Sequence, residues 1–359
     1  MRWTNVPEAR KAPAGQAGHG SICRENQARN DVLTHFSRAM EQGRPDVAAS
    51  RATEDVMATR MSSKVEATGP NLDPKTITID PLTPVIGAEI GGVDLSKPIG
   101  PEAEAELRAA QAAYHVLVFR DQALSNEDHK RFARMWGTRL HVHPYHVAKI
   151  IPEHARGGGH NEHDPEILVV KADQKSKVVA GEEWHTDVSC DAEPPMGSML
   201  YLTQTPEIGG GDTLFISAVR AYEALSPMMK DIVGRMTAIH DGAKPYIGGY
   251  GQTPPEGGWP KTTHPMVITV PWSGKKSLYV NRGFVTRIPE LERKESDAFL
   301  ELLYKHIEGH VEFQCRVRWK PNTLVFWDNW CTQHHAVWDY YPYSRYGQRV
   351  SIVNGKPTA

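Results

Sequence analysis

Several features that would identify particular protein classes are missing from this sequence. Only four cysteines occur among its 359 residues, far apart and without a C-x-x-C pair, so neither a disulfide scaffold nor a cysteine-based zinc or redox site is indicated. No apolar run approaches the ~20 residues that span a bilayer, and the N-terminus shows no secretory signal. The 41 Lys and Arg residues are balanced by 43 Asp and Glu, which leaves no basic excess for binding nucleic acid. These absences predict a cytoplasmic protein whose partners include neither membrane nor nucleic acid.

The first part of the chain differs in composition from the rest. Residues 1–76 are rich in Ala, Arg, Gly, Glu and Pro and show little apolar periodicity, so we expect a mostly disordered N-terminal extension. Met57 and Met61 lie just before the first strand-like run, so a later translation start is a working hypothesis. Residues 77–359 are expected to form one domain, because this length can bury a sizeable core.

Short strand-like runs separated by Gly and Pro turns dominate residues 77–359. Typical runs are EILVV, MGSMLYLTQT, TLFIS, EFQCRVRW and TLVFWDN. Helical patterns are confined to four segments, namely residues 102–114, 126–136, 217–234 and 290–308. No Gly-rich phosphate-binding loop is present, which disfavours nucleotide chemistry. The pattern predicts a mainly β fold with peripheral helices, arranged as a β-barrel or a jelly roll rather than a parallel α/β sheet.

A possible metal site comes from histidines and an aspartate in two distant segments. His185 and Asp187 alternate in WHTDV and would project from the same face of a strand. His334, in DNWCTQHHAV, follows another strong strand. Its neighbour His335 would point to the opposite side of a strand, where it would pack against other side chains or hold a metal ligand in position. Two imidazoles and one carboxylate leave positions open on a metal, as in non-haem Fe(II) oxygenases. The alternative for the short motif is a hydrogen-bonded His and Asp pair in a turn.

Longer stretches around these residues carry a family resemblance. They include WHTDVSCDAEPPMGSMLYL, GGGDTLFISAVRAYEALSP, LYVNRGFVTRI and WDNWCTQHHAVWDYYPYSRYGQRVSIVNG. From about residue 77 to the end, the chain resembles the taurine dioxygenase-like Fe(II)/2-oxoglutarate-dependent dioxygenases. The resemblance implies a double-stranded β-helix, Fe(II) held by His185, Asp187 and His334, and 2-oxoglutarate and O2 as cosubstrates. It also implies a homo-oligomer, either a dimer or a tetramer.

The resemblance assigns two residues to 2-oxoglutarate. The family's arginine for the distal carboxylate lies eleven residues after the last histidine, which places it at Arg345, and its hydroxyl partner falls on Thr213 in the G-G-D-T turn. A guanidinium suits this task because its planar fork donates two parallel hydrogen bonds to a carboxylate. The alternative is a solvated arginine and an ordinary turn residue.

Substrate contacts are likewise implied by the resemblance. Arg349, with His143 in LHVHP, would bind the anionic group of a substrate through charge-assisted hydrogen bonds, and His141 is the less favoured of the two histidines. The pocket walls would come from three aromatic residues, Tyr145, Tyr246 and Phe284. The glycine- and proline-rich loop around Tyr246 is a candidate lid.

One departure from the family pattern bears on the substrate. Gly181 stands where taurine dioxygenase has an asparagine close to the substrate's amine. We therefore expect a sulfur-metabolism enzyme that hydroxylates the carbon next to the anionic group of another sulfonate, releasing sulfite and an aldehyde, or of an alkyl sulfate. The alternatives are a phenoxyalkanoate dioxygenase of the same family, a zinc-dependent hydrolase with Glu182 or Glu183 as its base, and a catalytically inactive binding protein.

Overall fold

The computed structural model describes residues 72–143, 158–160, 164–249, 254–255 and 257–359. The predicted N-terminal extension therefore lies outside the described residues, apart from its last few positions. There, the backbone N–H groups of Lys75, Thr76 and Ile77 donate to the carboxylate of Glu106, which ties the chain to the first helix before the first strand begins. Among the described helices, none is long and apolar enough to cross a membrane.

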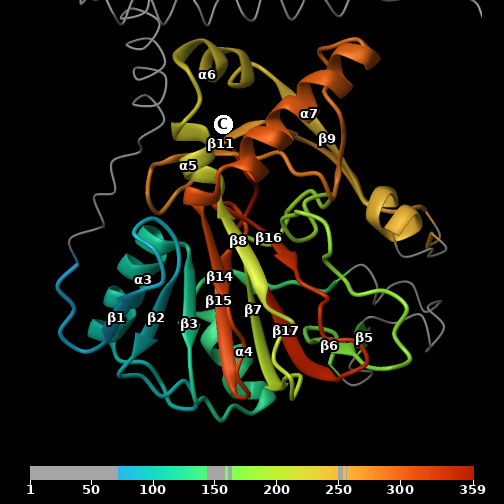
Figure 1. The fold of residues 1–359 in the computed structure, drawn as a ribbon. Coiled ribbons are helices and arrows are strands. Elements are labelled where there is room, and N and C mark those ends of the chain that lie inside the picture. Colours follow the sequence, from blue (N-terminus) through green and yellow to red (C-terminus); the bar gives the residue numbers. More distant parts are fainter. Residues whose placement is uncertain (1–71, 144–157, 161–163, 250–253, 256) are drawn as a thin grey trace, which may run out of the picture. The chain divides into compact units, whose positions relative to one another are not determined.

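The larger sheet contains nine strands and runs through the middle of the fold (Figure 1). Along it lie β1 (Thr78–Pro81), β2 (Ala88–Gly91), β3 (Val116–Phe119), β15 (Thr323–Asp328), β7 (Gly197–Gln204), β17 (Arg345–Val353), β6 (Leu168–Ala172) and β5 (Gly158–His160), while β4 (Arg139–Leu140) pairs with β17. The β2–β3 pair is parallel and the other pairs described for this sheet are antiparallel.

A smaller antiparallel sheet packs against one face of the larger one. It is formed by β14 (Gln314–Val317), β8 (Thr213–Ser217) and β16 (Thr332–Ala336). Alternate residues of each strand point into the layer between the sheets, so Leu200 and Leu202 of β7 share a buried cluster with Phe215 of β8 and Val317 of β14. Burial of each such side chain contributes about 1.5–3 kcal/mol.

Two helices cover the opposite face of the larger sheet. They are α3 (Pro101–Tyr114) and α4 (Asn126–Arg134), whose Leu107 and Phe132 pack with Leu117 and Phe119 of β3. Ser125 caps α4 through a reciprocal capping box with Asp128. The larger sheet is therefore buried on both faces.

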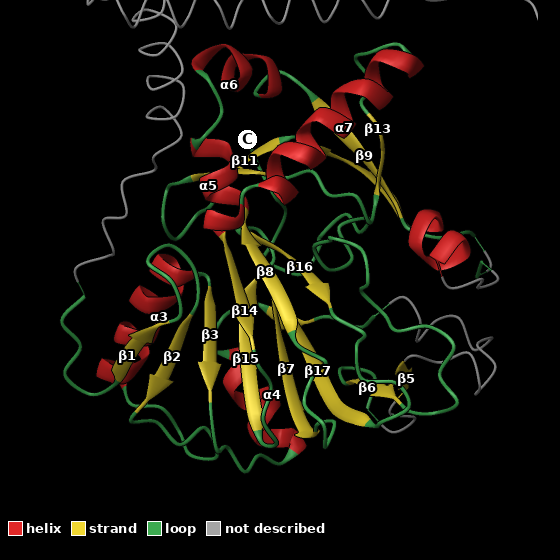
Figure 2. Ribbon diagram, in the orientation of Figure 1, coloured by secondary structure: helices red, strands yellow, loops and turns green. Residues whose placement is uncertain are grey.

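The remaining helices and strands form a region at one end of the two sheets (Figure 2). It holds α5 (Ala218–Glu223), α6 (Pro227–Val233), α7 (Arg293–Gly309), β9 (Thr237–Asp241), β10 (Lys261–Pro265), β11 (Val267–Thr269), β12 (Lys276–Leu278), β13 (Val285–Arg287), and the short η3 (Lys244–Gly249) and η4 (Val311–Phe313). Leu300 and Leu303 of α7 pack with Val285 of β13 and Ala221 of α5 in a core separate from that between the sheets.

The prediction of a mainly β fold with peripheral helices is confirmed. The helix predicted over residues 217–234 is instead two helices, because Ser226 caps a new helix that has Pro227 in its first turn. Proline lacks the N–H that would continue the first helix and favours this starting position. The last helix begins at Arg293 rather than residue 290, since Glu292 and Glu295 form its capping box.

Candidate active site

His185, Asp187 and His334 converge where the smaller sheet meets the loop before β7. His185 and His334 face each other across a two-residue bridge with backbone hydrogen bonds of 3.1 and 2.8 Å. Each imidazole Nε2 lies 3.9 Å from Oδ1 of Asp187, and all three side chains are largely buried. The three predicted residues therefore bring two nitrogens and one oxygen to a common point. The predicted strand at His185 and Asp187 is wrong, because His185 forms only an isolated bridge and Asp187 lies in a turn, whereas His334 belongs to β16.

Hydrogen bonding and burial prepare these groups to act as ligands. Nδ1 of His185 donates to the carbonyl oxygen of Glu183 at 2.7 Å, so its Nε2 carries the lone pair that faces Asp187. Burial lowers the pKa of His185 and, still more, that of His334, which keeps both rings neutral. Burial alone would raise the pKa of Asp187, but the Arg349 guanidinium and the two histidines hold it below its ordinary value. Two neutral imidazoles and one carboxylate form a donor set that suits a divalent transition metal.

Two arginines of β17 point into the layer between the sheets. Arg345 and Arg349 are four residues apart and therefore share the inner face of the strand. Arg349 Nη1 donates to Asp187 Oδ1 at 2.5 Å. Gly347 lies between them, and a Cβ on it would lie 2.2 Å from the carbonyl oxygen of Tyr201, so only glycine lets β17 approach β7 this closely.

Arg345 and Thr213 are supported by one tryptophan. The Arg345 guanidinium lies over the Trp319 ring at 5.4 Å, and Nε1 of the same ring donates to Thr213 Oγ1 at 3.0 Å. Arg345 and Thr213 are 3% and 5% exposed. Because the threonine oxygen already accepts this bond, its own proton is available for a ligand oxygen. A buried guanidinium and a hydroxyl donor are both groups that can donate hydrogen bonds to a carboxylate.

A cavity of about 370 Å³ brings the predicted site residues together. It is lined by His143, His185, Asp187, Thr213, Tyr246, Phe284, His334, Arg345 and Arg349. Tyr145, the remaining predicted contact, lies outside the described residues. His141 does not line the cavity and instead hydrogen-bonds through Nε2 to Asp191 at 2.6 Å, which agrees with its less favoured place in the sequence analysis.

Three aromatic rings form one wall of the cavity. The Tyr246 ring lies 6.1 Å from the His143 ring and 6.0 Å from the Phe284 ring, in edge-to-face contacts. Lys244, which precedes this wall, donates from Nζ to the carbonyl oxygen of Val285 at 3.0 Å and also contacts the carbonyl oxygen of Arg282. The start of the segment predicted as a lid is therefore hydrogen-bonded to both sides of Phe284, in the turn before β13 and at the first residue of β13.

Sequence reasoning missed the aliphatic part of the lining. Leu168 and Val170 of β6, together with Val178 and Val179, face the same cavity. The alternation in EILVV was the available signal, but it does not say what the strand faces. This wall makes one side of the cavity apolar.

The structure gives a physical reason for Gly181. Its φ of +93° is a left-handed conformation that favours glycine, and a Cβ there would lie 2.9 Å from Cε1 of His185. The carbonyl oxygen of Gly181 accepts a hydrogen bond from the backbone N–H of Ala336 at 2.8 Å. A Cβ at residue 181 would therefore crowd the His185 ring, on a backbone conformation that already favours glycine.

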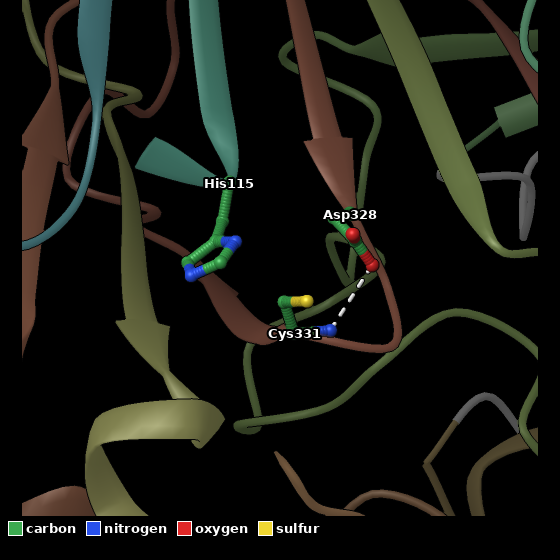
Figure 3. Close-up of side chains that lie close together, drawn as sticks. All are labelled: His115, Asp328 and Cys331. Atoms are coloured by element: carbon green, nitrogen blue, oxygen red, sulfur yellow. Dashed lines mark hydrogen bonds between the residues drawn. The ribbon is translucent and has the colours of Figure 1, made fainter. Parts of the chain in front are cut away.

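A second buried group of ligand-type residues lies at the start of β3 and the end of β15. His115, Asp328 and Cys331 have their potential ligand atoms within 4.8 Å of one another (Figure 3). Asp328 Oδ1 accepts the backbone N–H groups of Trp330 at 2.8 Å and Cys331 at 3.0 Å, so this carboxyl group organises the turn after β15. None of these three residues lines the cavity described above.

Comparison with known proteins places most of the chain in one group. The family described as "Taurine catabolism dioxygenase TauD, TfdA family" matches residues 78–351. The chain is 32% identical to an alpha-ketoglutarate-dependent sulfonate dioxygenase of Saccharomyces cerevisiae, covering 78% of this chain and 68% of that protein. It is 27% identical to an alpha-ketoglutarate-dependent sulfate ester dioxygenase of Pseudomonas putida, covering 83% and 95%. A taurine dioxygenase structure from Burkholderia xenovorans matches with a TM-score of 0.65 and 31% identity, covering 79% of this chain and 92% of that one.

Proposed function

The chain belongs to the taurine catabolism dioxygenase TauD, TfdA family, and on this basis we propose that it is an Fe(II)- and 2-oxoglutarate-dependent dioxygenase of a small sulfonate or alkyl sulfate. The observation that carries the proposal is the meeting of two sets of residues in one cavity. Nε2 of His185 and Nε2 of His334 each lie 3.9 Å from Asp187 Oδ1. Arg345 and Thr213, which would bind a carboxylate, line the same cavity.

The metal would be held by His185, Asp187 and His334. Their nitrogen and oxygen atoms match the ligand types of a two-histidine, one-carboxylate iron centre, which leaves positions for other ligands. Bound Fe(II), with 2-oxoglutarate and O2, supplies the oxidising chemistry that hydroxylates a C–H bond. Arg345 and Thr213 would bind the distal carboxylate of 2-oxoglutarate, and Trp319 keeps both groups in place.

The substrate's anionic group would be bound by Arg349 with His143. Arg349 is held at the metal ligands by its bond to Asp187, so an anion that it binds sits with its neighbouring carbon close to the reacting position. The walls formed by Tyr246, Phe284 and the aliphatic residues of β6 would contact the carbon chain. Tyr145 remains a proposed contact beside this group.

The apolar lining favours a substrate with a plain alkyl chain over one whose chain carries an amine group. Gly181 offers no side chain for an amine, and a Cβ there would crowd the His185 ring. Glu182 and Glu183 line the cavity but are exposed at its edge, which gives a hydrolytic base little support. A phenoxyalkanoate, whose carboxylate would also pair with Arg349, is the second candidate substrate.

The remaining parts of the proposal concern the domain, the sheet architecture, the cellular location and the oligomeric state. We propose that residues 77–359 form the catalytic domain, and that the two facing sheets form the double-stranded β-helix, or jelly roll, of this family. The enzyme is proposed to be cytoplasmic and to form a homo-oligomer, as its family resemblance implies.

Two measurements test the proposal. Anaerobic addition of Fe(II) and 2-oxoglutarate should produce a weak visible charge-transfer band, which a zinc hydrolase or an inactive binding protein would not give. In air, a panel of alkylsulfonates, alkyl sulfates and phenoxyalkanoates should then be assayed for succinate, with sulfite as the second product of a sulfonate. Absence of the band in folded, metal-loaded protein would refute the dioxygenase assignment, whereas succinate driven only by phenoxyalkanoates would correct the substrate.

A further inference from the structure

The carboxylate of Asp187 is held from its far side by a buried serine. Oδ1 faces the two histidines, whereas Oδ2 accepts a 2.7 Å hydrogen bond from the hydroxyl of Ser198 on β7. Ser198 is fully buried and is on the inner face of the larger sheet, two residues before Leu200. The two oxygens of one carboxylate therefore have different environments.

The direction of this hydrogen bond follows from a chain of donors. The indole Nε1–H of Trp327 can only donate, and it bonds to Asn329 Oδ1 at 2.9 Å, which fixes the orientation of that amide. The amide nitrogen of Asn329 must then donate to Ser198 Oγ, 3.0 Å away. The single hydroxyl proton of Ser198 is left to point at Asp187 Oδ2. Asn329 Oδ1 also accepts the backbone N–H of Asp187 at 3.3 Å.

We propose that Ser198 and Asn329 are positioning residues that orient Asp187 so that only Oδ1 is offered to the metal. Ser198 occupies Oδ2, while Oδ1 keeps one lone pair for the metal beside the bond from Arg349. Outer partners of metal ligands fix ligand orientation and set affinity. This inference rests on the proposed metal-binding function of Asp187.

Ser351 provides a matched control. Its Oγ lies 3.1 Å from Ser198 Oγ, and because the serine proton is already committed to Asp187, Ser351 donates this bond. Ser351 touches the same hydroxyl from outside the donor chain that reaches Asp187. Both serines are buried, at 0% and 6% exposure, so removing either hydroxyl leaves a similar small gap.

The test is the affinity of the full chain for Mn(II), measured by calorimetry without 2-oxoglutarate or substrate. We expect Ser198→Ala to weaken Mn(II) binding by about 10–100-fold. Ser351→Ala should stay within about threefold of wild type. Ser198→Cys, which fills the space with a weaker donor, should fall between wild type and Ser198→Ala. Melting temperatures of the metal-free variants check that each one folds.

The outcomes separate this inference from the proposed function. Mn(II) binding by wild type, together with equal affinity of folded Ser198→Ala or Ser198→Cys, would overturn the positioning role alone. An equal loss in Ser351→Ala would also overturn it, because both serines would then act by supporting the fold. Failure of wild type to bind Mn(II) would overturn the proposed metal site and this inference with it.

Discussion

Two buried clusters in this molecule combine histidine with aspartate, but their carboxyl groups behave in opposite ways. In the first, the pKa of Asp187 lies below its ordinary value although burial alone would raise it, because Arg349 and two histidines face the carboxylate. In the second, burial raises the pKa of Asp328 to about 7, although hydrogen bonds from the Cys331 side chain and from the backbone N–H groups of Trp330 and Cys331 oppose the rise. Burial also lowers the pKa of His115 to about 3.

The difference teaches that residue types alone do not make a functional site. Both clusters bring ligand-type atoms within 4.8 Å of one another. Only the first borders the cavity, has a neighbouring cation that keeps its carboxylate ionised, and presents one oxygen toward two imidazoles. Asp328 instead uses its carboxyl group to hold the turn after β15. Substitutions in each cluster can test whether the two clusters differ in function.

The largest effect is expected from replacing the two aspartates in turn. Asp187→Asn removes the anionic ligand, so we expect succinate formation and Mn(II) affinity to fall by more than ~100-fold, beyond the range for an outer partner. Asp328→Asn keeps the shape of the turn and should retain activity within about threefold at pH 8. Comparable losses in both variants, with both proteins folded, would show that the two clusters are not functionally distinct.

A smaller effect is expected when the cation of the first cluster is removed. Arg349→Gln should lower kcat/KM for an anionic substrate by about 100-fold. The substrate's anionic group would lose its cationic partner, and truncating one partner of a buried charge pair costs several kcal/mol. Turnover of 2-oxoglutarate without substrate should persist. Steady-state kinetics with and without substrate separate the two, and equal loss of both activities would assign Arg349 to the metal or the cosubstrate instead.

Removing a neutral donor near the cavity should matter less again. Trp319→Phe keeps a ring beneath Arg345 but leaves Thr213 Oγ1 without its 3.0 Å hydrogen bond. We expect the KM for 2-oxoglutarate to rise about 5–10-fold, the value of one net hydrogen bond, with kcat little changed. An unchanged KM would mean that the hydroxyl of Thr213 needs no orientation.

The smallest effect on activity, but a clear effect on stability, concerns the pH response of the second cluster. Because the pKa of Asp328 is raised, the folded state keeps a proton that the unfolded state releases between about pH 4 and pH 7. This term makes folding less favourable as pH rises through that window, by at most about 1.4 kcal/mol per unit, and is level above about pH 7. Asp328→Asn lacks it.

Urea unfolding at pH 5, 6, 7 and 8 measures this term. The stability of Asp328→Asn relative to wild type should rise from pH 5 to pH 7 and then stay constant. His115 is present in both proteins, so its own titration largely cancels in the difference. Parallel stability curves would show that Asp328 has an ordinary pKa.

Sequence patterns predicted the local features of the fold and of the site. The helix over residues 126–136 and the mainly β architecture follow from short-range periodicity, and the structure confirms both. His185 and Asp187 do point to one site as predicted, but they do so from a bridge and a turn rather than from a strand. The family resemblance supplied Arg345 and Thr213, which the structure places in the same cavity as His334.

The supporting contacts could not be predicted because they join distant strands. Asn329 reaches Ser198 across 131 positions, and Trp319 reaches Thr213 across 106. Such pairs depend on which strands are neighbours and on their register, which alternation within a strand does not specify. The break at Pro227 was missed for the opposite reason, since apolar periodicity continues through a residue that begins a new helix.

Gly181 has a consequence for attempts to redesign this enzyme. A laboratory seeking activity on amine-bearing sulfonates would first place a polar residue there. The left-handed backbone disfavours such a residue, and its Cβ, 2.9 Å from Cε1 of His185, would push against the ring of a proposed metal ligand. Leu168 and Val170 line the same cavity from a regular strand and carry no such restriction. Directed evolution of substrate range should therefore begin with these two positions and leave Gly181 unchanged.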